Sequence, residues 1–558
     1  MPSRTYARFC VPLIAALTAC SGNQSGSSPA IPAASVTTHS SVRPAERIGG
    51  VIKTTTFVVG SQPVYVDRDL IVFASKAVKI FGDVTVTGDH TVAFFSPQFF
   101  MYNGSTIVES GTIQRGRTII ADVVSACRIF MANGSSWTLA AGKDLYITAN
   151  YSPNNGTKCV TEVDAGARLM LDTALKGTKS SPNGGSGGNL YVGSGQAEFF
   201  TDRISSENGR SYLRAFSPDR FNLYTSVTAG NGADGADDPT GQLVNGQYEF
   251  SGGSGGTGGS VELVTTTAAG GSHLTAGNGG NAGTIGANAS CSSSSMNGTA
   301  TAPNALAAQI FMGRGGDGGD MYVRTRKGTR IVATSGSGGS PSLLTNKYAN
   351  YTFCGGNGFA SPAPGALTMG NGGNVTLNIA SPGKAGRSYG EHEGANGKFN
   401  PIVFGGGEAC GACGGAEPIS GVAQGQDIQG ANGGNLTLVL PPRVTAAELV
   451  STYGLRITLG GFGYGGGSFV TDTPYSYCPS PDPQGFNGGN GGALHDNGLW
   501  PLMYPPGSPV TNWGYGFYAG GGASGNPGGN TGNNGYDDEG LQIGQVAPRQ
   551  NIICNGQT

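Results

Sequence analysis

Three short stretches hold acidic side chains whose spacing allows acid–base chemistry or the binding of a hard cation. They are residues 231–239 (NGADGADDP), residues 391–393 (EHE) and residues 535–540 (GYDDEG). Adjacent residues of a strand point to opposite faces, so the EHE triplet does not present its three side chains together. The other two clusters have the composition of exposed loops. The sequence therefore predicts no catalytic residue and argues against enzymatic activity without excluding it.

Another pair of carboxylates, Asp317 and Asp320, lies in the segment GGDGGDMYV at residues 315–323. This segment resembles the calcium-binding repeat GGxGxDxUx of toxin-type β-rolls, and the resemblance implies that both carboxylates would bind calcium. β-Roll repeats follow each other in tandem, whereas the similar segments here lie 54 or more residues apart. Those segments replace Asp320 by Asn189, Ser260, Asn374 and Asn435. Calcium is the only cofactor that the sequence suggests.

Eight of the ten cysteines lie in the body of the chain: Cys127, Cys159, Cys291, Cys354, Cys410, Cys413, Cys478 and Cys554. An even number in an exported chain favours disulfides, although sequence order alone leaves their connectivity open. Because stacked repeats contact mainly their neighbours, we expect the pairs Cys127–Cys159, Cys291–Cys354 and Cys478–Cys554. The CGAC segment lacks the helix that lowers the thiol pKa of a redox pair, so we expect Cys410 and Cys413 to form a structural link.

The C-terminal region, residues 471–558, concentrates large aromatic side chains between proline and glycine. Aromatic faces beside polar loops can stack on sugar rings. A solenoid also needs a cap over its last open coil, and the sequence favours this second role. The candidates for stacking on a glycan are Trp500, Tyr504, Trp513, Tyr515 and Tyr518.

Charge and motif context exclude several classes of binding protein. The net charge is -2 and the isoelectric point is about 6.2, so the chain lacks the basic surface that nucleic acids require. Residues 461–466 match GxGxxG, but no helix pattern follows them, so dinucleotide binding is not expected. Glycine provides 100 of the 558 residues, about 18% where ~7% is usual. Because charged residues are only 12% and aromatic residues reach 8%, we expect a folded chain nevertheless.

The N-terminus has the pattern of an export signal. Arg4 and Arg8 precede a short apolar run that ends at Leu17, too short for a stable membrane span. The segment Leu17–Cys20 resembles the lipobox of bacterial lipoproteins. That resemblance implies cleavage of residues 1–19, lipidation of Cys20 and, with serine rather than aspartate next, a place in the outer membrane of a bacterium with two membranes. Several acyl chains suffice for stable anchoring.

Residues 20–47 then form a flexible tether, and residues 48–183 form a β-rich domain with short β-branched and aromatic runs. From residue 184 to residue 470 one join recurs, in which a glycine-rich tract runs into a short alternating strand. Examples are GGSGGNLYV, GGTGGSVELV, GGDGGDMYV, GNGGNVTLNI and GANGGNLTLVL. A fixed join at irregular spacing predicts a common structural step with variable insertions.

Alternation in such a strand, for example residues 375–379, directs every second side chain to one face. Glycine accepts positive φ and close backbone approach, so we expect the glycine tracts to form the corners of stacked coils. The predicted fold is all-β, a glycine-rich parallel β-solenoid with long irregular loops. Two alternatives stay open: a bundle of polyglycine II helices, which the period-three tract GGSGGTGG favours, and β-sandwich units. A helix is expected only at residues 443–454, where Thr445 and Glu448 form a capping box.

The repeat region resembles the glycine-rich β-helices of bacterial surface proteins and autotransporter-like passengers. This resemblance implies a lipid-anchored structural or adhesive protein at the cell surface, with glycans or other surface proteins as partners and no nucleic acid. One alternative is a polysaccharide lyase or hydrolase, which needs paired carboxylates in one groove. Another is a protein that assembles into fibres through open edges.

Overall fold

The computed structural model describes residues 47–110, 121–150, 158–209 and 214–238 as long segments. It also describes residues 242–244, 247–270, 273–284, 308–311, 313–326, 332–339, 367–368, 370–379, 402–405, 428–429, 434–439, 457–459, 493–495, 535–536 and 542–543. Within these segments, no helix has the length and apolar character needed to cross a bilayer.

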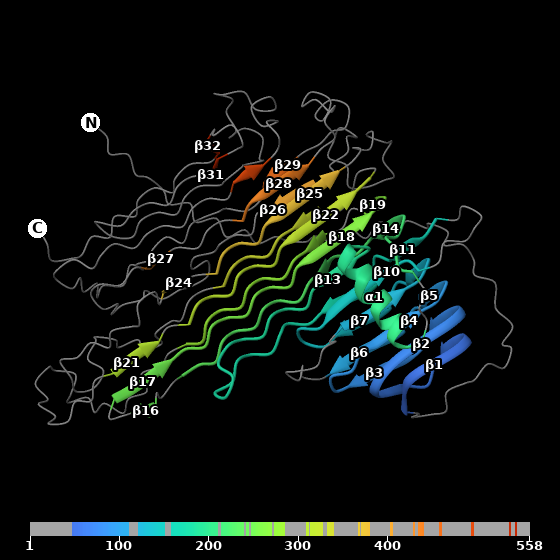
Figure 1. The fold of residues 1–558 in the computed structure, drawn as a ribbon, viewed down its shortest axis with the longest axis horizontal. Coiled ribbons are helices and arrows are strands. Elements are labelled where there is room, and N and C mark those ends of the chain that lie inside the picture. The colour runs from blue at the N-terminus through green and yellow to red at the C-terminus, as the bar shows by residue number, and fades with distance from the viewer. Residues whose placement is uncertain are drawn as a thin grey trace, which may run out of the picture. The chain divides into compact units, whose positions relative to one another are not determined.

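The strands form a parallel β-solenoid, as predicted, with up to three faces per coil (Figure 1). The first face contains β3 (Asp83–Thr87), β6 (Thr106–Ser110), β9 (Ser136–Leu139), β12 (Arg168–Leu171), β15 (Val227–Thr228), β20 (His273–Thr275), β23 (Val332–Thr334), β26 (Ile402–Gly405) and β29 (Ile457–Leu459). The second face contains β4 (Val92–Phe95), β7 (Ala121–Ser125), β10 (Asp144–Thr148), β13 (Leu190–Val192), β18 (Val261–Thr265), β22 (Met321–Thr325), β25 (Val375–Ile379), β28 (Leu436–Val439) and β30 (Leu494–His495). The third face contains β5 (Gln98–Met101), β8 (Arg128–Met131), β11 (Val160–Val163), β14 (Arg220–Leu223) and β19 (Thr267–Ala269).

The first two coils consist of one long strand each, β1 (Arg47–Val59) and β2 (Val64–Ile80). β2 bends around all three faces, because successive parts of it pair with β3, β4 and β5. The second face then continues in register from β10 through β13 to β18, across the expected boundary at residue 184. The β-rich part and the glycine-rich part therefore share one continuous sheet.

Among the described residues, seven short strands lie outside the three faces. They are β16 (Gln242–Val244), β17 (Gln247–Ser251) and β21 (Ala308–Phe311), which pair together, β24 (Leu367–Thr368) with β27 (Ile428–Gln429), and β31 (Gly535–Tyr536) with β32 (Gln542–Ile543). All belong to segments between the solenoid strands or after them.

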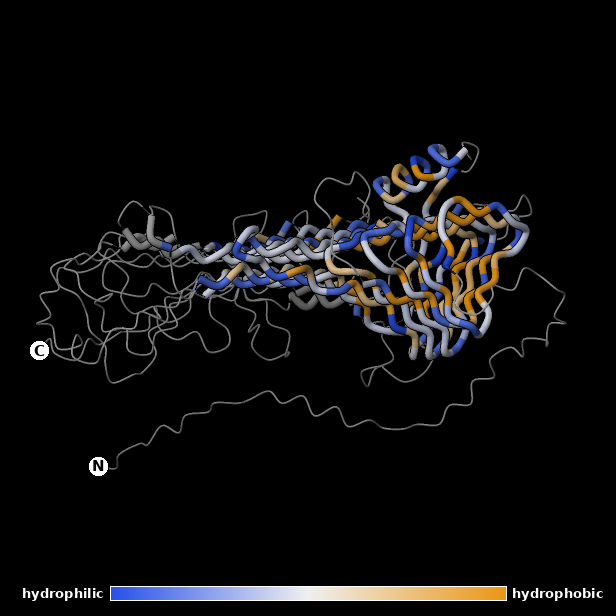
Figure 2. The backbone as a smooth tube through the Cα atoms, turned by 90° about the horizontal axis from the view of Figure 1, so that it is seen from below, coloured by the Kyte–Doolittle hydropathy of each residue, from blue (hydrophilic) through white to orange (hydrophobic). Residues whose placement is uncertain are grey.

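The interior of the solenoid is a continuous apolar core built from alternate strand residues. In β18, for example, Val261 and Leu263 are buried while Glu262 between them faces outward. Phe94, Phe99 and Trp137 are among the largest fully buried side chains of this core, and their ring centroids lie 5.3–6.2 Å apart. Hydrophobic residues are concentrated in these coils, whereas the glycine tracts are mostly pale or hydrophilic (Figure 2).

The glycine tracts form a hydrogen-bonded two-layer arrangement, here called the glycine bundle. Its outgoing segments (229–238, 276–284 and 335–339) follow first-face strands, and its returning segments (184–189, 252–260, 313–320 and 370–374) lead into second-face strands. Hydrogen bonds join both layers and successive coils at every third residue, for example from the N–H of Gly253, Gly256 and Gly259 to the opposite layer.

One triplet shows how this bundle satisfies its backbone. The N–H of Gly230 crosses to the other layer and donates to the carbonyl of Gly188 at 2.9 Å. The N–H of Gly232 donates to the carbonyl of Asn278 in the next coil at 2.7 Å. Oδ1 of Asn231 accepts the N–H of that same Asn278 at 2.9 Å. The predicted solenoid is thus confirmed, and the period of three with hydrogen bonds between segments agrees with the polyglycine II alternative for the glycine tracts.

Close approach, rather than positive φ, selects glycine in the bundle. A β-carbon on Gly256 would lie 1.8 Å from the carbonyl oxygen of Gly185, and one on Gly316 would lie 1.9 Å from that of Gly256. Positive φ occurs at other described glycines, such as Gly104 and Gly134 in turns. The expectation that the glycine tracts are corners with positive φ is therefore wrong for the described bundle, and the expectation of close backbone approach is confirmed.

A helix, α1 (Gly195–Glu207), is inserted after β13 and covers the second face over β10 and β13 (Figure 1). Its N-cap is Ser194, whose side chain accepts the N–H of Ala197 at 3.2 Å. Its buried side, which includes Ala197 and Ile204, packs on the outward residues of the second face. This helix was not predicted from the sequence, and the helix expected at residues 443–454 lies outside the described residues.

Candidate functional site

A column of outward side chains on the second face begins beneath α1 and continues beyond it. Tyr146 pairs with Tyr191, Tyr191 with Glu262, and Glu262 with Tyr322, each in the next coil. The parallel register places these residues in line along one flat face. Aromatic and acidic side chains therefore share one surface, although they come from segments far apart in the sequence.

Three aromatic rings stack at the start of this column. Phe200 of α1 lies with its ring centroid 4.5 Å from that of Tyr146, at an interplanar angle of 10°. Tyr191 stacks on the same Tyr146 with centroids 4.9 Å apart and an angle of 11°. Tyr146 is buried and Tyr191 is partly exposed, so the stack presents one aromatic ring beside the helix. A partly exposed ring next to polar groups can stack on a sugar face.

Asp144 lies at the edge of this stack and is tightly held. Its Oδ1 accepts the backbone N–H of Asn189 at 2.7 Å and the side-chain Nδ2 of Asn189 at 2.9 Å. Its Oδ2 accepts the hydroxyl of Tyr146 at 3.4 Å. Burial raises the pKa of Asp144 to about 6, and the hydrogen bonds from Asn189 and Tyr146 oppose this rise. A carboxyl group that titrates near neutral pH can serve as a general acid.

Glu262, which pairs with Tyr191 in the next coil, is a second carboxylate that acts on the stack. Burial, followed by the charges of Asp144 and Glu262, raises the pKa of Tyr191 to about 12. The negative charges of both carboxylates therefore disfavour ionisation of the Tyr191 hydroxyl. Asp144 belongs to the coil before Tyr191 and Glu262 to the coil after it. Glycoside hydrolysis uses a pair of carboxylates.

A ladder of polar side chains, here called the amide ladder, runs along the edge where the glycine bundle meets the second face. Each member accepts the backbone N–H of the next coil. Asn189 Oδ1 accepts from Ser260 at 2.7 Å, Asp320 Oδ1 from Asn374 at 2.7 Å, and Asn374 Oδ1 from Asn435 at 3.0 Å. Asp144 begins the ladder.

The residues of the calcium prediction are therefore part of the bundle surface. Asp320 belongs to the amide ladder, and Oδ1 of Asp317 accepts the N–H of Asn371 at 2.6 Å and a bond from Arg314 at 2.6 Å. Among the described residues, no group of three or more His, Cys, Asp or Glu side chains gathers in a way that could hold a metal ion. Calcium binding by this pair stays a prediction.

Acidic side chains of the stretch at residues 231–239 also accept backbone N–H groups of the next coil. Asp234 and Asp237 each accept the backbone N–H of the next coil, from Asn281 and Thr284, both at 2.8 Å. Asp237 also pairs with Lys176 at 2.5 Å on the surface. The expectation of exposed loop acids is close to this result, but the acids lie in an ordered bundle and complete its hydrogen bonds.

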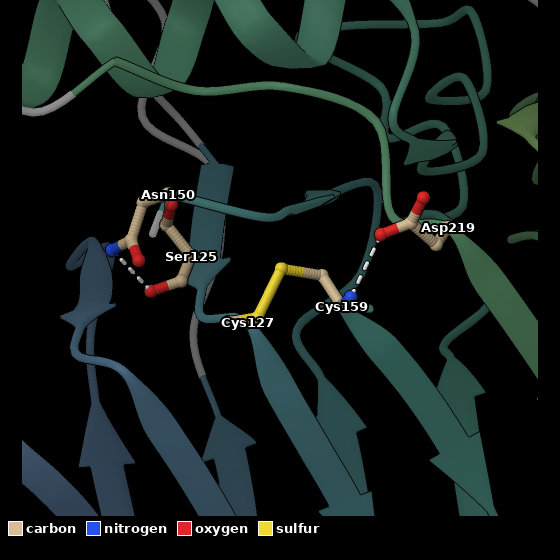
Figure 3. The surroundings of a disulfide bond; sticks show 5 residues. All are labelled: Ser125, Cys127, Asn150, Cys159 and Asp219. Atoms are coloured by element: carbon tan, nitrogen blue, oxygen red, sulfur yellow. Dashed lines mark hydrogen bonds between the residues drawn. A yellow bond between two sulfur atoms is a disulfide. The ribbon is translucent and has the colours of Figure 1, made fainter. Parts of the chain in front are cut away.

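One predicted disulfide is confirmed: Cys127 and Cys159 are bonded across β8 and β11 (Figure 3). Around the bond, Oδ2 of Asp219 accepts the N–H of Cys159 at 2.8 Å, and Nδ2 of Asn150 donates to the carbonyl of Ser125 at 2.6 Å (Figure 3). The remaining predicted sites lie outside the described residues. They are Cys20, the cysteines from Cys291 onward, the EHE triplet at 391–393, the acidic stretch at 535–540 apart from Gly535 and Tyr536, and the aromatic residues from Trp500 to Tyr518.

The comparisons with family models, with curated proteins and with solved structures found no match for this chain.

Proposed function

We propose that this chain is a lipid-anchored surface protein that holds variable segments away from a membrane and uses them for adhesion, with glycans as the binding partner. The lipid is attached at Cys20, the tether follows, and the solenoid with its glycine bundle acts as the rigid support. The protein is exported and belongs to the outer membrane in this proposal.

The glycine bundle is the observation that carries this proposal. Outgoing and returning segments alternate, so each coil leaves the solenoid and comes back to it. The described ends of these segments meet in pairs, since the N–H of Gly253 donates to the carbonyl of Ala236 and the N–H of Gly370 donates to that of Gly339. A support that satisfies its own backbone hydrogen bonds tolerates insertions of different length at its free end. The irregular spacing of the repeats fits this use.

The chemistry of the bundle surface supports binding to uncharged polar partners. Asn, Ser, Thr and Asp occupy the outward positions, and the chain as a whole carries a net charge of only -2. Hydrogen-bond donors and acceptors without a strong field favour glycans over nucleic acids or acidic lipids.

Two experiments test the proposal at separate points. The first is glycan-array binding by the full chain, compared with a variant in which residues 285–312 are replaced by a short Gly-Asn linker and with a variant that lacks residues 500–518. We expect weaker binding in at least one variant, and equal binding by all three forms would contradict the adhesive role. The second is fractionation of cells that express Cys20→Ser, which we expect to release the protein from the membrane.

A second candidate, a polysaccharide-cleaving enzyme, is supported by Asp144 and Glu262 on the second face. Its test is the release of reducing ends or unsaturated products from a panel of polysaccharides by the wild type, Asp144→Asn and Glu262→Gln. Glu162→Gln, an outward carboxylate of β11 on the third face, is the matched control. Activity that only the second-face variants lose would favour the enzyme over the adhesin.

A further inference from the structure

A buried group of three ionisable side chains lies at the corner between the first and second faces, apart from the candidate site. Glu109 comes from β6, Asp122 from β7, and Lys143 from the turn between β9 and β10. The side chain of Lys143 is 3% exposed, and those of Glu109 and Asp122 are fully buried. Burying charged groups in an apolar core costs free energy unless each charge is compensated, so the presence of three ionisable groups here is unusual.

The three groups are in direct contact. Nζ of Lys143 lies 2.5 Å from Oε2 of Glu109 and 2.6 Å from Oδ1 of Asp122, and it also donates to the backbone carbonyl of His90 at 2.6 Å. Trp137 Nε1 donates to Oε1 of Glu109 at 3.2 Å and holds that carboxyl in place. An amine nitrogen is thus held against a carboxyl group, away from solvent.

The charges of this group do not balance if all three are ionised, because two carboxylates face one ammonium. Burial, followed by the charge of Glu109, raises the pKa of Asp122 well above its usual value. This rise favours the protonated form of Asp122 beside the single ammonium of Lys143. Oδ2 of Asp122 is buried and has no hydrogen-bond partner within the described structure, which is the position that a leaving hydroxyl would occupy.

We propose that Lys143 and Asp122 condense into an intramolecular amide, with Glu109 as the base that accepts a proton from Lys143. The arrangement holds what such a reaction requires: a buried amine, a neutral carboxyl group in contact with it, and a base beside both. Water at high concentration normally opposes amide formation, and this corner is closed to bulk solvent.

The reaction can be written with all atoms balanced. Lys143 transfers a proton from Nζ to Glu109, and the neutral amine attacks Cγ of Asp122. The N–H of Val92 donates to Oδ1 of Asp122 at 2.9 Å and stabilises the negative oxygen that develops there. The Cγ–Oδ2 bond breaks and one water molecule leaves. One ammonium, one carboxylic acid and one carboxylate become one amide, one water and one neutral Glu109, with no oxidant or reductant.

The product also fits the corner. The amide keeps a single N–H, which can donate to the carbonyl of His90, and its carbonyl oxygen keeps the bond from Val92. No net charge remains buried. The bond ties β7 to the turn before β10, where the returning segment of the glycine bundle passes so closely that a β-carbon on Gly188 would lie 2.0 Å from the carbonyl oxygen of Lys143. It therefore links two coils at the base of the bundle.

Tryptic peptide mapping of the full, purified, reduced chain tests the proposal. Trypsin does not cleave after an acylated lysine, so we expect residues 118–128 joined to an uncleaved 129–158 peptide, lighter by one water than the sum of the two. Fragment spectra should place the branch at Asp122 and Lys143. Recovery of separate 118–128, 129–143 and 144–158 peptides, with no branched species, would overturn the proposal.

A variant of Glu109 and an exposed lysine–carboxylate pair test the role of the base and the need for burial. Glu109→Gln keeps both reacting groups, and we expect its reduced digest to yield only the unbranched peptides. A parallel digest without reduction should retain the Cys127–Cys159 disulfide, which reports that the fold has formed. A branched peptide in that variant would overturn the role of Glu109. The Lys176–Asp237 pair of the wild type is the matched control. Its two side chains are in contact at 2.5 Å, as in the buried group, but they are 55% and 40% exposed. No branched peptide is expected at that pair. If Glu109→Gln does not fold, the wild-type map alone decides.

Discussion

Oδ1 of Asn189 accepts a hydrogen bond from the backbone N–H of Ser260 at 2.7 Å, although 71 residues separate the two. The same bond recurs between Ser260 and Asp320, Asp320 and Asn374, and Asn374 and Asn435, at separations of 60, 54 and 61 residues. One short polar side chain per coil therefore keeps successive coils in register, whatever the length of the segment inserted between them.

The amide ladder should have a measurable local effect. Asn374→Ala removes the acceptor for the N–H of Asn435, and we expect a loss of about 1 kcal/mol, since the bond is exposed and water can replace it. Hydrogen exchange at Asn435 should become about fivefold faster. Thr376→Ala, an outward neighbour on β25, is the control, and an equal acceleration in that variant would remove the ladder as the cause.

Because the bundle is closely packed, replacing one of its glycines by alanine should strongly reduce the free energy of unfolding. Gly256→Ala would place its β-carbon 1.8 Å from a backbone oxygen, and we expect a loss of more than about 3 kcal/mol in the free energy of unfolding, because backbone on both sides cannot move away. Gly195→Ala is the matched control, since a β-carbon there meets nothing within 4 Å and alanine favours a helix. Thermal unfolding measures both, and similar melting temperatures would argue against a packed bundle.

Asp144 should make stability depend on pH. Its pKa is raised from the usual 3.8 to about 6 in the folded protein, so between these values the folded state binds more protons than the unfolded state. Stability should therefore fall as pH rises from about 4 to about 6, by up to about 3 kcal/mol. Asp144→Asn should remove this slope, because an amide does not titrate in this range. The fold should tolerate the change, since asparagine makes the same ladder bond at Asn374. Denaturant unfolding at a series of pH values measures it, and an unchanged slope in the variant would assign it to other groups.

The disulfide should contribute through the loop that it closes. Cys127 and Cys159 are 32 residues apart, and a loop of that size corresponds to about 3–4 kcal/mol in chain-entropy terms. The double variant with serine at both positions should lose this amount in denaturant unfolding. The double variant Cys410→Ser with Cys413→Ser, in the predicted CGAC link, serves as the comparison. A larger loss in its free energy of unfolding would mean that the link at 127–159 is not the main covalent constraint among the cysteines.

Local sequence pattern was enough to predict much of the fold. The alternating run at residues 375–379 is β25, and the same rule applies to each join with a described strand. Helix α1 was missed although Ser194, Ala197 and Ile204 have cap and helical spacing, because glycine and polar residues weaken the pattern around them. Asp144, Tyr191 and Glu262 could not be grouped, since insertions of unequal length separate their coils and only the register brings them together. The same holds for Glu109, Asp122 and Lys143.

Hydrogen–deuterium exchange of the full chain, resolved by mass spectrometry over residues 252–260, 276–284 and 313–320, tests the central claim most directly. If these glycine tracts form the hydrogen-bonded bundle that continues the solenoid, their amides should exchange as slowly as those of β18 and β22. Exchange at the rate of an unstructured chain, with protected strands on either side, would contradict the bundle and the rigid support that depends on it.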